Sequence, residues 1–284
     1  MNTLILNGEL VSLSTFHITS ENRAFAYGDG LFETIKVANN RVLFADRHIQ
    51  RFNAGLKALQ LNLPVVLTGN DLQNQVSKMI SNDSTLKNSR VKLTAFRNDG
   101  GRYTPKTLSA SYIITATPVE NIAYTLNEKG VSVEVYTEIE KPYNAISSFK
   151  CLNSMTYVLA GIYASTKGLQ DSLIINPRQQ IIETINSNIF LIVKGEYYTP
   201  PVTSGCIDGV MRSVIITILR EMGENVHETN ITTEQLLAAD EVFKTNVIQG
   251  IQWIGAFRQK RYYKTETTKL INEVNRRLFE PSVY

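Results

Sequence analysis

Apolar residues in the first part of the chain fall into short runs, which predict β-strands, and into two periodic stretches, which predict helices. Asn7-Gly8 lies between two of the runs and is typical of a tight β-hairpin, and Asn39-Asn40 indicates a second turn. Asp46 is a candidate N-cap for the first helix. The predicted strands are residues 4–6, 10–11, 31–37, 42–44, 91–96 and 112–116. Apolar positions spaced by three or four residues mark the helices: Ile49, Phe52, Leu56 and Leu59 in the first, and Leu72, Val76 and Ile80 in the second.

The second part of the chain is richer in predicted strands, and three predicted helices interrupt them. Lys194-Gly195 joins two strands as a hairpin. Gly168 and Gly223 follow two of the helices and predict where they end, because glycine readily adopts the left-handed conformation of a helix C-terminus. The predicted strands are residues 131–136, 173–175, 189–193 and 197–199, and the helices are residues 154–167, 210–222 and 267–278. The first of these helices has an apolar face made of Met155, Val158, Leu159 and Ile162.

The order of these elements predicts the fold class. Strands and helices mingle without the regular alternation of a parallel sheet, so both halves of the chain are expected to be α+β. Residues 118–127 carry no clear periodicity and are the candidate interdomain linker. We therefore predict an N-terminal α+β domain at 1–117 and a C-terminal α+β domain at 128–284.

Composition narrows the class of protein. The chain has 284 residues, which is enough for one large domain or two modest ones. Hydrophobic residues make up 43% and charged residues 19%, the balance of an ordinary globular protein. The net charge of +3 argues against a nucleic-acid surface but leaves room for a small anionic ligand.

Several signals are missing from the sequence. No apolar run approaches the roughly 20 residues of a membrane helix, and the first residues lack the pattern of a signal peptide. Cys151 and Cys206 are too few for a disulfide framework, and no cysteine or histidine spacing indicates a zinc site. We therefore expect a cytoplasmic protein with neither a membrane span nor a bound metal.

Lys150 is the first candidate for chemistry. It lies in SSFKCLN, residues 147–153, between an extended segment and a predicted helix, and its neighbours suggest a partly buried place. A lysine amine that is shielded from water is more often neutral, and it then becomes a nucleophile. Taken alone, such a lysine is more often a surface residue whose stem packs on apolar neighbours.

Other segments offer an acid and a place for phosphate. Glu183 lies in IIETINSNIF among apolar residues and needs a partner if it is buried, although it could also face water at a strand end. Residues 208–212, DGVMR, open a predicted helix whose first backbone N–H groups could bind phosphate. Arg51 and the loop at 245–251 could assist. A lysine, an acid and a phosphate cradle are the parts of a pyridoxal phosphate site.

The joint order of these segments is more informative than any one of them. They read NRAFAYGDGLFET, RHIQRF, KCLN, IIETINSNIF, DGVMR and ADEVFKTN, at residues 22–34, 47–52, 150–153, 181–190, 208–212 and 239–246. In this order the sequence resembles the class IV aminotransferase family, also called fold-type IV pyridoxal-phosphate enzymes. That family includes branched-chain aminotransferases, D-amino acid aminotransferases and 4-amino-4-deoxychorismate lyases.

The resemblance implies a fold, a cofactor and roles for single residues. The fold would be two α+β domains with pyridoxal 5′-phosphate in the cleft between them, in a homodimer that binds a small amino substrate. Lys150 resembles the Schiff-base lysine and general acid/base, and Glu183 resembles the acid that keeps the pyridine nitrogen protonated. Arg51 resembles the phosphate-binding arginine. The remaining phosphate contacts would come from Val210, Met211, Asn246 and Val247.

Departures from the family pattern bear on the reaction. Many members have threonine or serine at Val247, and the aminotransferases commonly read GITR where this chain reads GVMR. Methionine at that place and RNDGGRY at 97–103 are more similar to the lyase branch. A lyase that releases pyruvate from aminodeoxychorismate to give 4-aminobenzoate is therefore favoured over a branched-chain or D-amino acid aminotransferase.

Arg97 and Arg102 are candidate binders of a substrate carboxylate, although both could simply belong to a charged loop. A non-catalytic binding protein with this fold is disfavoured, because the types of residue at Lys150 and Glu183 are those that catalysis requires.

Overall fold

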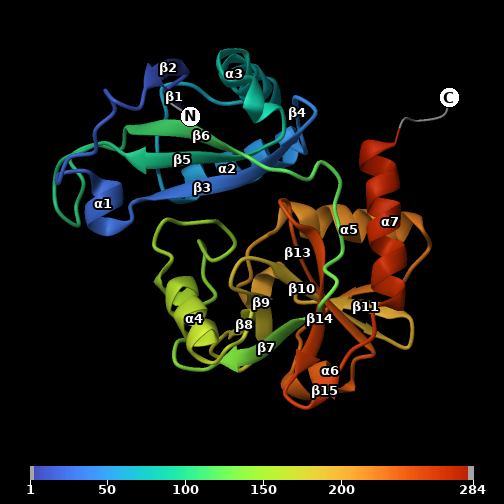
Figure 1. Cartoon of the computed structure of the whole chain (residues 1–284). Helices are drawn as coiled ribbons and strands as arrows, with labels where there is room; N and C mark the ends of the chain where they lie inside the picture. Colours follow the sequence, from blue (N-terminus) through green and yellow to red (C-terminus); the bar gives the residue numbers. More distant parts are fainter. Residues whose placement is uncertain (1–2, 281–284) are drawn as a thin grey trace. The chain divides into compact units, whose positions relative to one another are not determined.

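The computed structural model describes residues 3–280 and shows an α+β protein, as predicted. The chain forms two compact units. The first unit contains the residues up to Ile122 together with Phe149–Asn153, and the second contains Ala123–Ser148 and the residues from Ser154 onward. Figure 1 colours the chain along the sequence. The segment Phe149–Asn153 falls inside the range predicted for the C-terminal domain but packs with the first unit.

The first unit is built on one antiparallel sheet of six strands in the order β2-β1-β6-β5-β3-β4. Asn7 and Gly8 have φ angles of 50° and 93°, which confirms the predicted hairpin turn between the first two strands. The strands are β1 (Thr3–Leu6), β2 (Glu9–Ser12), β3 (Gly30–Ala38), β4 (Arg41–Val42), β5 (Ser89–Arg97) and β6 (Ala110–Pro118).

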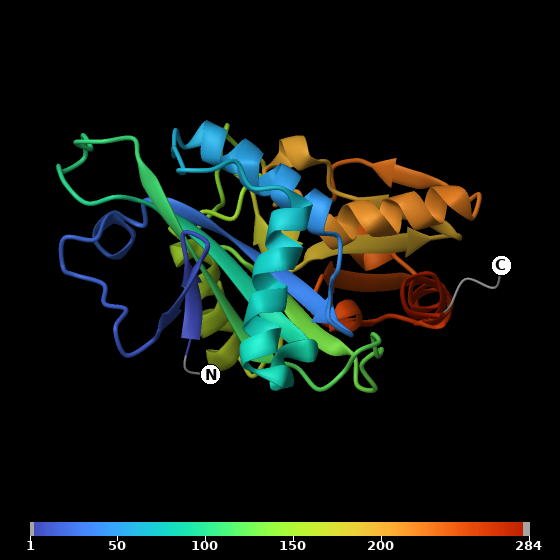
Figure 2. The same cartoon turned by 90° about the horizontal axis from the view of Figure 1, so that it is seen from above.

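Two long helices cover one face of this sheet. They are α2 (Ala45–Ala58) and α3 (Gly69–Asn82), and a short helix α1 (Arg23–Tyr27) and a 3-10 turn η1 (Ser84–Lys87) accompany them. Figure 2 shows α3 lying across the strands. The N-cap of α2 is Phe44, in a left-handed conformation with φ of 56°. The predicted cap at Asp46 is therefore wrong, and the predicted strand at 42–44 ends at Val42 because the chain turns at Phe44.

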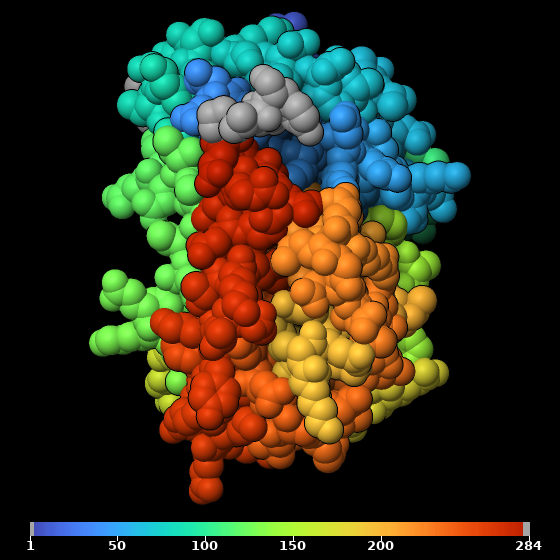
Figure 3. Space-filling view, turned by 90° about the vertical axis from the view of Figure 1, so that its right-hand side faces the viewer, coloured from blue at the N-terminus to red at the C-terminus, as the bar shows by residue number. Residues whose placement is uncertain are grey.

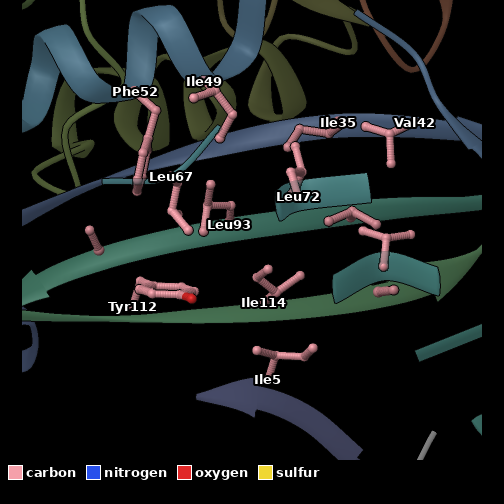
Figure 4. Packing of buried hydrophobic residues seen from close by; sticks show 14 of the residues in the cluster. Ile5, Ile35, Val42, Ile49, Phe52, Leu67, Leu72, Leu93, Tyr112 and Ile114 are labelled. Carbon is pink, nitrogen blue, oxygen red and sulfur yellow. The ribbon is translucent and has the colours of Figure 1, made fainter. Parts of the chain in front are cut away.

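Side chains from both helices meet the sheet in a single apolar cluster. Figure 4 shows Phe52 of α2 and Leu72 of α3 pointing toward the strand residues Leu93 and Ile114. All four are fully buried, and each such side chain contributes roughly 1.5–3 kcal/mol by its removal from water. Successive residues of a strand point to opposite faces, so the core takes alternate residues of β3, such as Ile35.

Glu33 is an exception among the core-facing residues of β3, because it brings a charge under α2. Its Oε1 accepts a hydrogen bond from Arg51 Nε at 2.7 Å, and its Oε2 accepts one from Arg51 Nη2 at 2.6 Å. His48 Nδ1 lies 2.7 Å from the same Oε2. His48 and Arg51 are three residues apart on α2 and therefore share one helix face. We call these three residues the buried ion cluster.

The charges of the buried ion cluster set its protonation. Burial alone would raise the pKa of Glu33, but the Arg51 guanidinium and His48 outweigh it and lower that pKa to about 2. Burial lowers the pKa of His48 from its usual value, and the charges of Arg51 and Lys150 act in the same direction against the opposing effect of Glu33. At neutral pH the cluster is thus a carboxylate, a neutral imidazole and a guanidinium.

The second unit contains a mixed sheet of nine strands in the order β12-β11-β10-β13-β14-β7-β8-β9, with β15 paired to β14. The strand β7 is parallel to β8 and β14, and β11 is parallel to β12, while the other pairs are antiparallel. The strands are β7 (Val131–Tyr136), β8 (Asp171–Ile175), β9 (Ile181–Thr184), β10 (Asn188–Val193), β11 (Glu196–Thr199), β12 (Val226–Glu228), β13 (Glu241–Asn246), β14 (Gly250–Phe257) and β15 (Lys260–Arg261).

Four helices and a 3-10 turn pack around that sheet: α4 (Met155–Thr166), η2 (Val202–Ser204), α5 (Val210–Glu221), α6 (Thr233–Ala238) and α7 (Thr265–Phe279). Gly168 and Gly223, with φ of 68° and 83°, follow α4 and α5 as predicted. Figure 3 shows α7, in red, on the surface of this unit. Within residues 3–280, no helix has the length and apolar character needed to cross a membrane.

The apolar face predicted for α4 is mostly turned to the solvent. Met155, Val158 and Ile162 are 62%, 50% and 55% exposed, whereas Ala160 and Ala164 are buried. The helix packs on β8 through these small residues. Periodicity alone could not tell which of two apolar faces enters the core, because this helix is apolar on nearly all sides.

The buried ion cluster should stabilise the first unit in a pH-dependent way. Glu33→Gln removes the charge that Arg51 faces, so we expect the free energy of unfolding in urea at pH 7 to fall by about 3–5 kcal/mol. Because the folded pKa of Glu33 is depressed to about 2 from 4.5, its contribution is complete above about pH 4.5 and is lost as the pH falls toward 2. The variant should therefore show a flatter acid dependence over that window.

A matched control is Glu21→Gln, which alters an exposed acid of the same unit. It should leave the free energy of unfolding within about 0.5 kcal/mol of the parent. Equal stability of the Glu33→Gln variant and the parent at pH 7 would show that the cluster does not stabilise the fold.

Candidate active site

The backbone around Lys150 is held against β3 like a short additional strand. Phe32 N donates to Lys150 O at 2.8 Å, and Leu152 N donates to Gly30 O at 3.0 Å. A side chain at Gly30 would not fit, because its Cβ would lie 2.2 Å from the carbonyl oxygen of Ala95 and 2.7 Å from Leu152. Gly30 thus permits the backbone pairing between β3 and the segment that carries Lys150.

The Lys150 side chain lies against an aromatic ring of the same strand. Its Nζ is 4.9 Å from the centre of the Phe32 ring, a distance at which an ammonium group is attracted to the ring face. Phe32 alternates with the core-facing residues Leu31 and Glu33, so the lysine is associated with the sheet face opposite to α2. Lys150 is also near enough to His48 for its charge to lower the pKa of that histidine.

Arg51 is held in a fixed orientation by the buried ion cluster. Its side chain is 9% exposed, and two of its nitrogens engage both oxygens of Glu33. A bidentate contact of this kind fixes the plane of the guanidinium as well as its position. The first unit thus carries both Lys150 and Arg51, and β3 positions each of them.

Arg97 and Arg102, the candidate carboxylate binders, have different surroundings. Arg97 is buried, and its Nε, Nη1 and Nη2 donate to Asp29 Oδ2, Gln60 O and Leu59 O at 2.9, 2.8 and 2.8 Å. Arg102 is exposed, and its carbonyl accepts a hydrogen bond from Arg23. A role for either side chain in substrate binding remains a prediction.

Glu183 is buried in the middle of β9 and has three donors. Its Oε1 accepts hydrogen bonds from Lys141 Nζ at 2.7 Å and from the Tyr157 hydroxyl at 2.8 Å, and its Oε2 accepts one from Ile207 N at 2.9 Å. The residue is 2% exposed, so Glu183 does not face water at a strand end, which was the other possibility from the sequence. A buried carboxylate with these donors is suited to bind a further protonated nitrogen.

The start of α5 lacks a side-chain cap. Its N-cap is Gly209, which offers no side-chain cap, so Val210 and Met211 bring backbone N–H groups to the first turn. A Cβ atom at Gly209 would lie 1.9 Å from Asn188 Oδ1, so the glycine is required by its surroundings. The contact between Glu183 and Ile207 N ties the buried acid to the chain that leads into this helix.

Asn246 and Val247 form a tight turn between β13 and β14. Asn246 Oδ1 accepts hydrogen bonds from the backbone N–H groups of Ile248 and Gln249 at 3.0 and 2.9 Å. The Asn246 side chain also donates to Ser187 Oγ at 2.9 Å. The carbonyl of Val247 accepts the hydroxyl of Tyr124 at 2.9 Å. These contacts hold the turn in one conformation.

Four polar residues of these networks were not identified from the sequence: Glu33, His48, Lys141 and Tyr157. Glu33 could have been found, since it is an acid in the apolar stretch LFETIKV and needs a partner if it is buried. His48 and Arg51, three positions apart on the predicted helix, were the candidate partners. Lys141 and Tyr157 lie 42 and 26 residues from Glu183, and no local pattern connects them to it.

Comparison with known proteins agrees with these features. Residues 30–257 match the family model described as amino-transferase class IV. The branched-chain-amino-acid aminotransferase of Escherichia coli K12 is 27% identical over 246 residues, which cover 84% of this chain and 79% of that protein. The aminodeoxychorismate lyase of Vibrio harveyi is 26% identical over 239 residues, which cover 83% of this chain and 85% of that protein.

The fold agrees as well. A crystal structure of the E. coli branched-chain aminotransferase has a TM-score of 0.88 at 24% sequence identity and covers 99% of this chain and 96% of that one. The resemblance deduced from the motifs is thereby confirmed, and so is the fold-type IV architecture. This chain belongs to the class IV aminotransferase family, the members of which depend on pyridoxal phosphate.

Proposed function

We propose that the protein is a pyridoxal-phosphate enzyme in which Lys150 carries the reacting amine. The observation behind this proposal is the fixed position of Lys150, whose backbone pairs with β3 while its amine lies 4.9 Å from the Phe32 ring centre. The fold class and the family membership described above support the same assignment.

Each unit offers residues of the types that bind this cofactor. In the first unit, Arg51 would bind the phosphate group with the guanidinium that Glu33 orients. In the second unit, Glu183 would hold the pyridine nitrogen, since its carboxylate is buried and already surrounded by donors. Backbone N–H groups at the start of α5 and in the turn after β13 would complete the phosphate site. These N–H groups belong to Val210, Met211, Asn246 and Val247.

Pyridoxal phosphate supplies a conjugated ring that accepts the electron pair left when the amino-bearing carbon of the substrate loses its proton. The residues of the chain handle that proton. The Lys150 amine would accept it and later return it, and Glu183 would bind the ring nitrogen. A lyase and a transaminase share the removal of this proton and differ in whether a bond to a leaving group then breaks.

Among the family's reactions, we infer the release of pyruvate from 4-amino-4-deoxychorismate, which yields 4-aminobenzoate. Met211 at the start of α5 and RNDGGRY at 97–103 support this reading, as does the V. harveyi lyase among the relatives. Amino-acid transamination, of branched-chain or D-amino acids, is the second candidate, and the equally similar E. coli enzyme supports it.

We further propose that the protein is a homodimer, as the family resemblance implies. The exposed apolar face of α4, formed by Met155, Val158 and Ile162, supports an interface, because exposed apolar residues that cluster often mark one.

Lys150→Ala tests the assignment of the reacting amine. The parent, purified with pyridoxal phosphate, should show a visible absorption band that borohydride removes. The variant should lack this band, and its activity should fall by at least about a thousandfold. Lys57→Ala, which alters an exposed lysine of α2, should keep both. A borohydride-sensitive band that persists in the Lys150→Ala variant contradicts the assignment.

The choice of reaction can be decided with the parent enzyme. With 4-amino-4-deoxychorismate we expect pyruvate, detected through lactate dehydrogenase, in equal amount to 4-aminobenzoate. Single amino acids added without a keto acid should leave the visible band unchanged, since a lyase restores its resting form in each turnover. Bleaching of the band by one amino acid, without pyruvate release from aminodeoxychorismate, would identify a transaminase.

The dimer proposal predicts a sedimentation result. The parent should sediment as a dimer at micromolar concentration. The double variant Val158→Glu, Ile162→Glu should sediment as a monomer, because dimer formation would bury the two new charges on the α4 face without partners. Leu237→Glu, on the exposed side of α6, should leave the dimer intact. A monomeric parent rules the proposal out, and a double variant that stays dimeric rules out the α4 interface.

A further inference from the structure

The peptide group between Val247 and Ile248 is held at both of its ends. Its carbonyl oxygen, which belongs to Val247, accepts a hydrogen bond from the Tyr124 hydroxyl at 2.9 Å. Its N–H group, which belongs to Ile248, donates to Asn246 Oδ1 at 3.0 Å. The carbonyl and the N–H of a trans peptide point in opposite directions, so a reversal of this peptide would break both hydrogen bonds. The peptide is therefore confined to one orientation.

This peptide lies in the turn between β13 and β14, which is one of the proposed phosphate contacts. Asn246 Oδ1 also accepts a hydrogen bond from the amide of Gln249 at 2.9 Å. The amides of Ile248 and Gln249 are thus used inside the turn, and a phosphate would meet the preceding amides of Asn246 and Val247. Backbone N–H groups attract an anion and carbonyl oxygens repel it, so the direction of each peptide in the turn decides how well it binds phosphate.

Tyr124 is itself fixed by its backbone and by its ring. Tyr124 N donates to Asn275 Oδ1 at 2.9 Å, and Asn275 Nδ2 donates to Tyr124 O at 2.8 Å. The ring meets that of Phe279 edge-on, with 5.6 Å between the two centres. Both partners belong to α7. The ring also fills the space beside Gly250, where a Cβ atom would lie 2.4 Å from Tyr124 Cγ.

The hydroxyl of Tyr124 is a permanent donor in a buried place. The residue is 4% exposed, and its hydrogen bond to Val247 is buried. Burial raises the pKa of Tyr124, so the hydroxyl stays protonated at neutral pH. It therefore directs the carbonyl of Val247 toward the interior of the second unit.

A second tyrosine of the same unit makes the same kind of contact elsewhere. Tyr262 is also 4% exposed, and its hydroxyl donates to the carbonyl of Leu236 at 2.8 Å. Leu236 belongs to α6, which carries none of the residues proposed for the cofactor. Tyr262 thus represents a core tyrosine with a purely structural role.

We propose that Tyr124 is a positioning residue for the cofactor phosphate. By holding the carbonyl of Val247 inward, it keeps the turn after β13 in the conformation that presents its backbone N–H groups to a phosphate. The proposal rests on the proposed function, because the turn has this role only if the protein binds pyridoxal phosphate. Tyr124 acts through the turn and makes no contact with the cofactor.

The experiment compares two probes that differ in the phosphate group. The full-length protein, freed of cofactor, is titrated with pyridoxal phosphate and with pyridoxal, and the visible band reports binding. We expect Tyr124→Phe to bind pyridoxal phosphate about five- to tenfold more weakly than the parent, the scale of one hydrogen bond. Its affinity for pyridoxal should stay within about twofold of the parent, because pyridoxal does not use the phosphate contacts.

Tyr262→Phe is the matched control. It removes the same hydroxyl from an equally buried tyrosine, so the midpoints of urea unfolding of the two variants should fall by similar amounts. Its affinities for both probes should stay within about twofold of the parent. Both probes are compared on the same variant, so a loss of stability alone does not produce the expected change in the ratio of their affinities.

Three results would overturn the proposal. An unchanged affinity of Tyr124→Phe for pyridoxal phosphate shows that the turn does not need this hydroxyl. Equal losses of affinity in Tyr124→Phe and Tyr262→Phe show a general weakening of the second unit. Equal losses for pyridoxal phosphate and pyridoxal in Tyr124→Phe show that the tyrosine does not act on the phosphate site.

The parent protein separates this inference from the proposed function. If the parent forms the borohydride-sensitive band and its preference for pyridoxal phosphate over pyridoxal does not depend on Tyr124, the inference fails while the function stands. If the parent never forms the band with added pyridoxal phosphate, the proposed function fails.

Discussion

The buried carboxylate of Glu33 is the constraint on which much of the first unit depends. A charge in an apolar core must be matched, so α2 can dock on the sheet only where Arg51 and His48 reach the two oxygens. Apolar contacts alone would tolerate small shifts of the helix, whereas a bidentate ion pair does not. The same strand carries Phe32 on its other face and pairs with the backbone of Lys150. The strand β3 therefore positions both the buried ion cluster and the proposed reactive amine.

The second unit solves a similar problem with different partners. Glu183 is surrounded by apolar strand residues, and Lys141, Tyr157 and the Ile207 amide compensate its burial. These three partners come from separate places along the chain, so the acid also joins segments that would otherwise be independent. In both units, a single buried acid on a strand both holds neighbouring elements together and contacts or belongs to the proposed site.

The sequence predicted the features that depend on neighbouring residues better than those that depend on residues far apart in the chain. The helices α2, α3 and α5 and the central strands follow from local periodicity, and the Asn7-Gly8 hairpin follows from turn chemistry. Left-handed Phe44 replaced the expected cap at Asp46, because no local rule favours that conformation for phenylalanine. The exposed face of α4 was not predictable either, since an all-apolar helix does not indicate its buried side. Motif order identified the family, and it suggested Lys150, Glu183 and Arg51, but not the residues that hold them.

The composition of the first unit has a consequence for how the protein is made. Its six strands are complete once the ribosome has passed Pro118, yet the segment Phe149–Asn153 belongs to the same unit and is synthesised later. The chain therefore begins the second unit before it returns to the first, where the segment around Lys150 pairs with β3. The six strands of this sheet are thus synthesised well before Lys150, and a fragment ending at Ile122 would contain the sheet but lack this lysine.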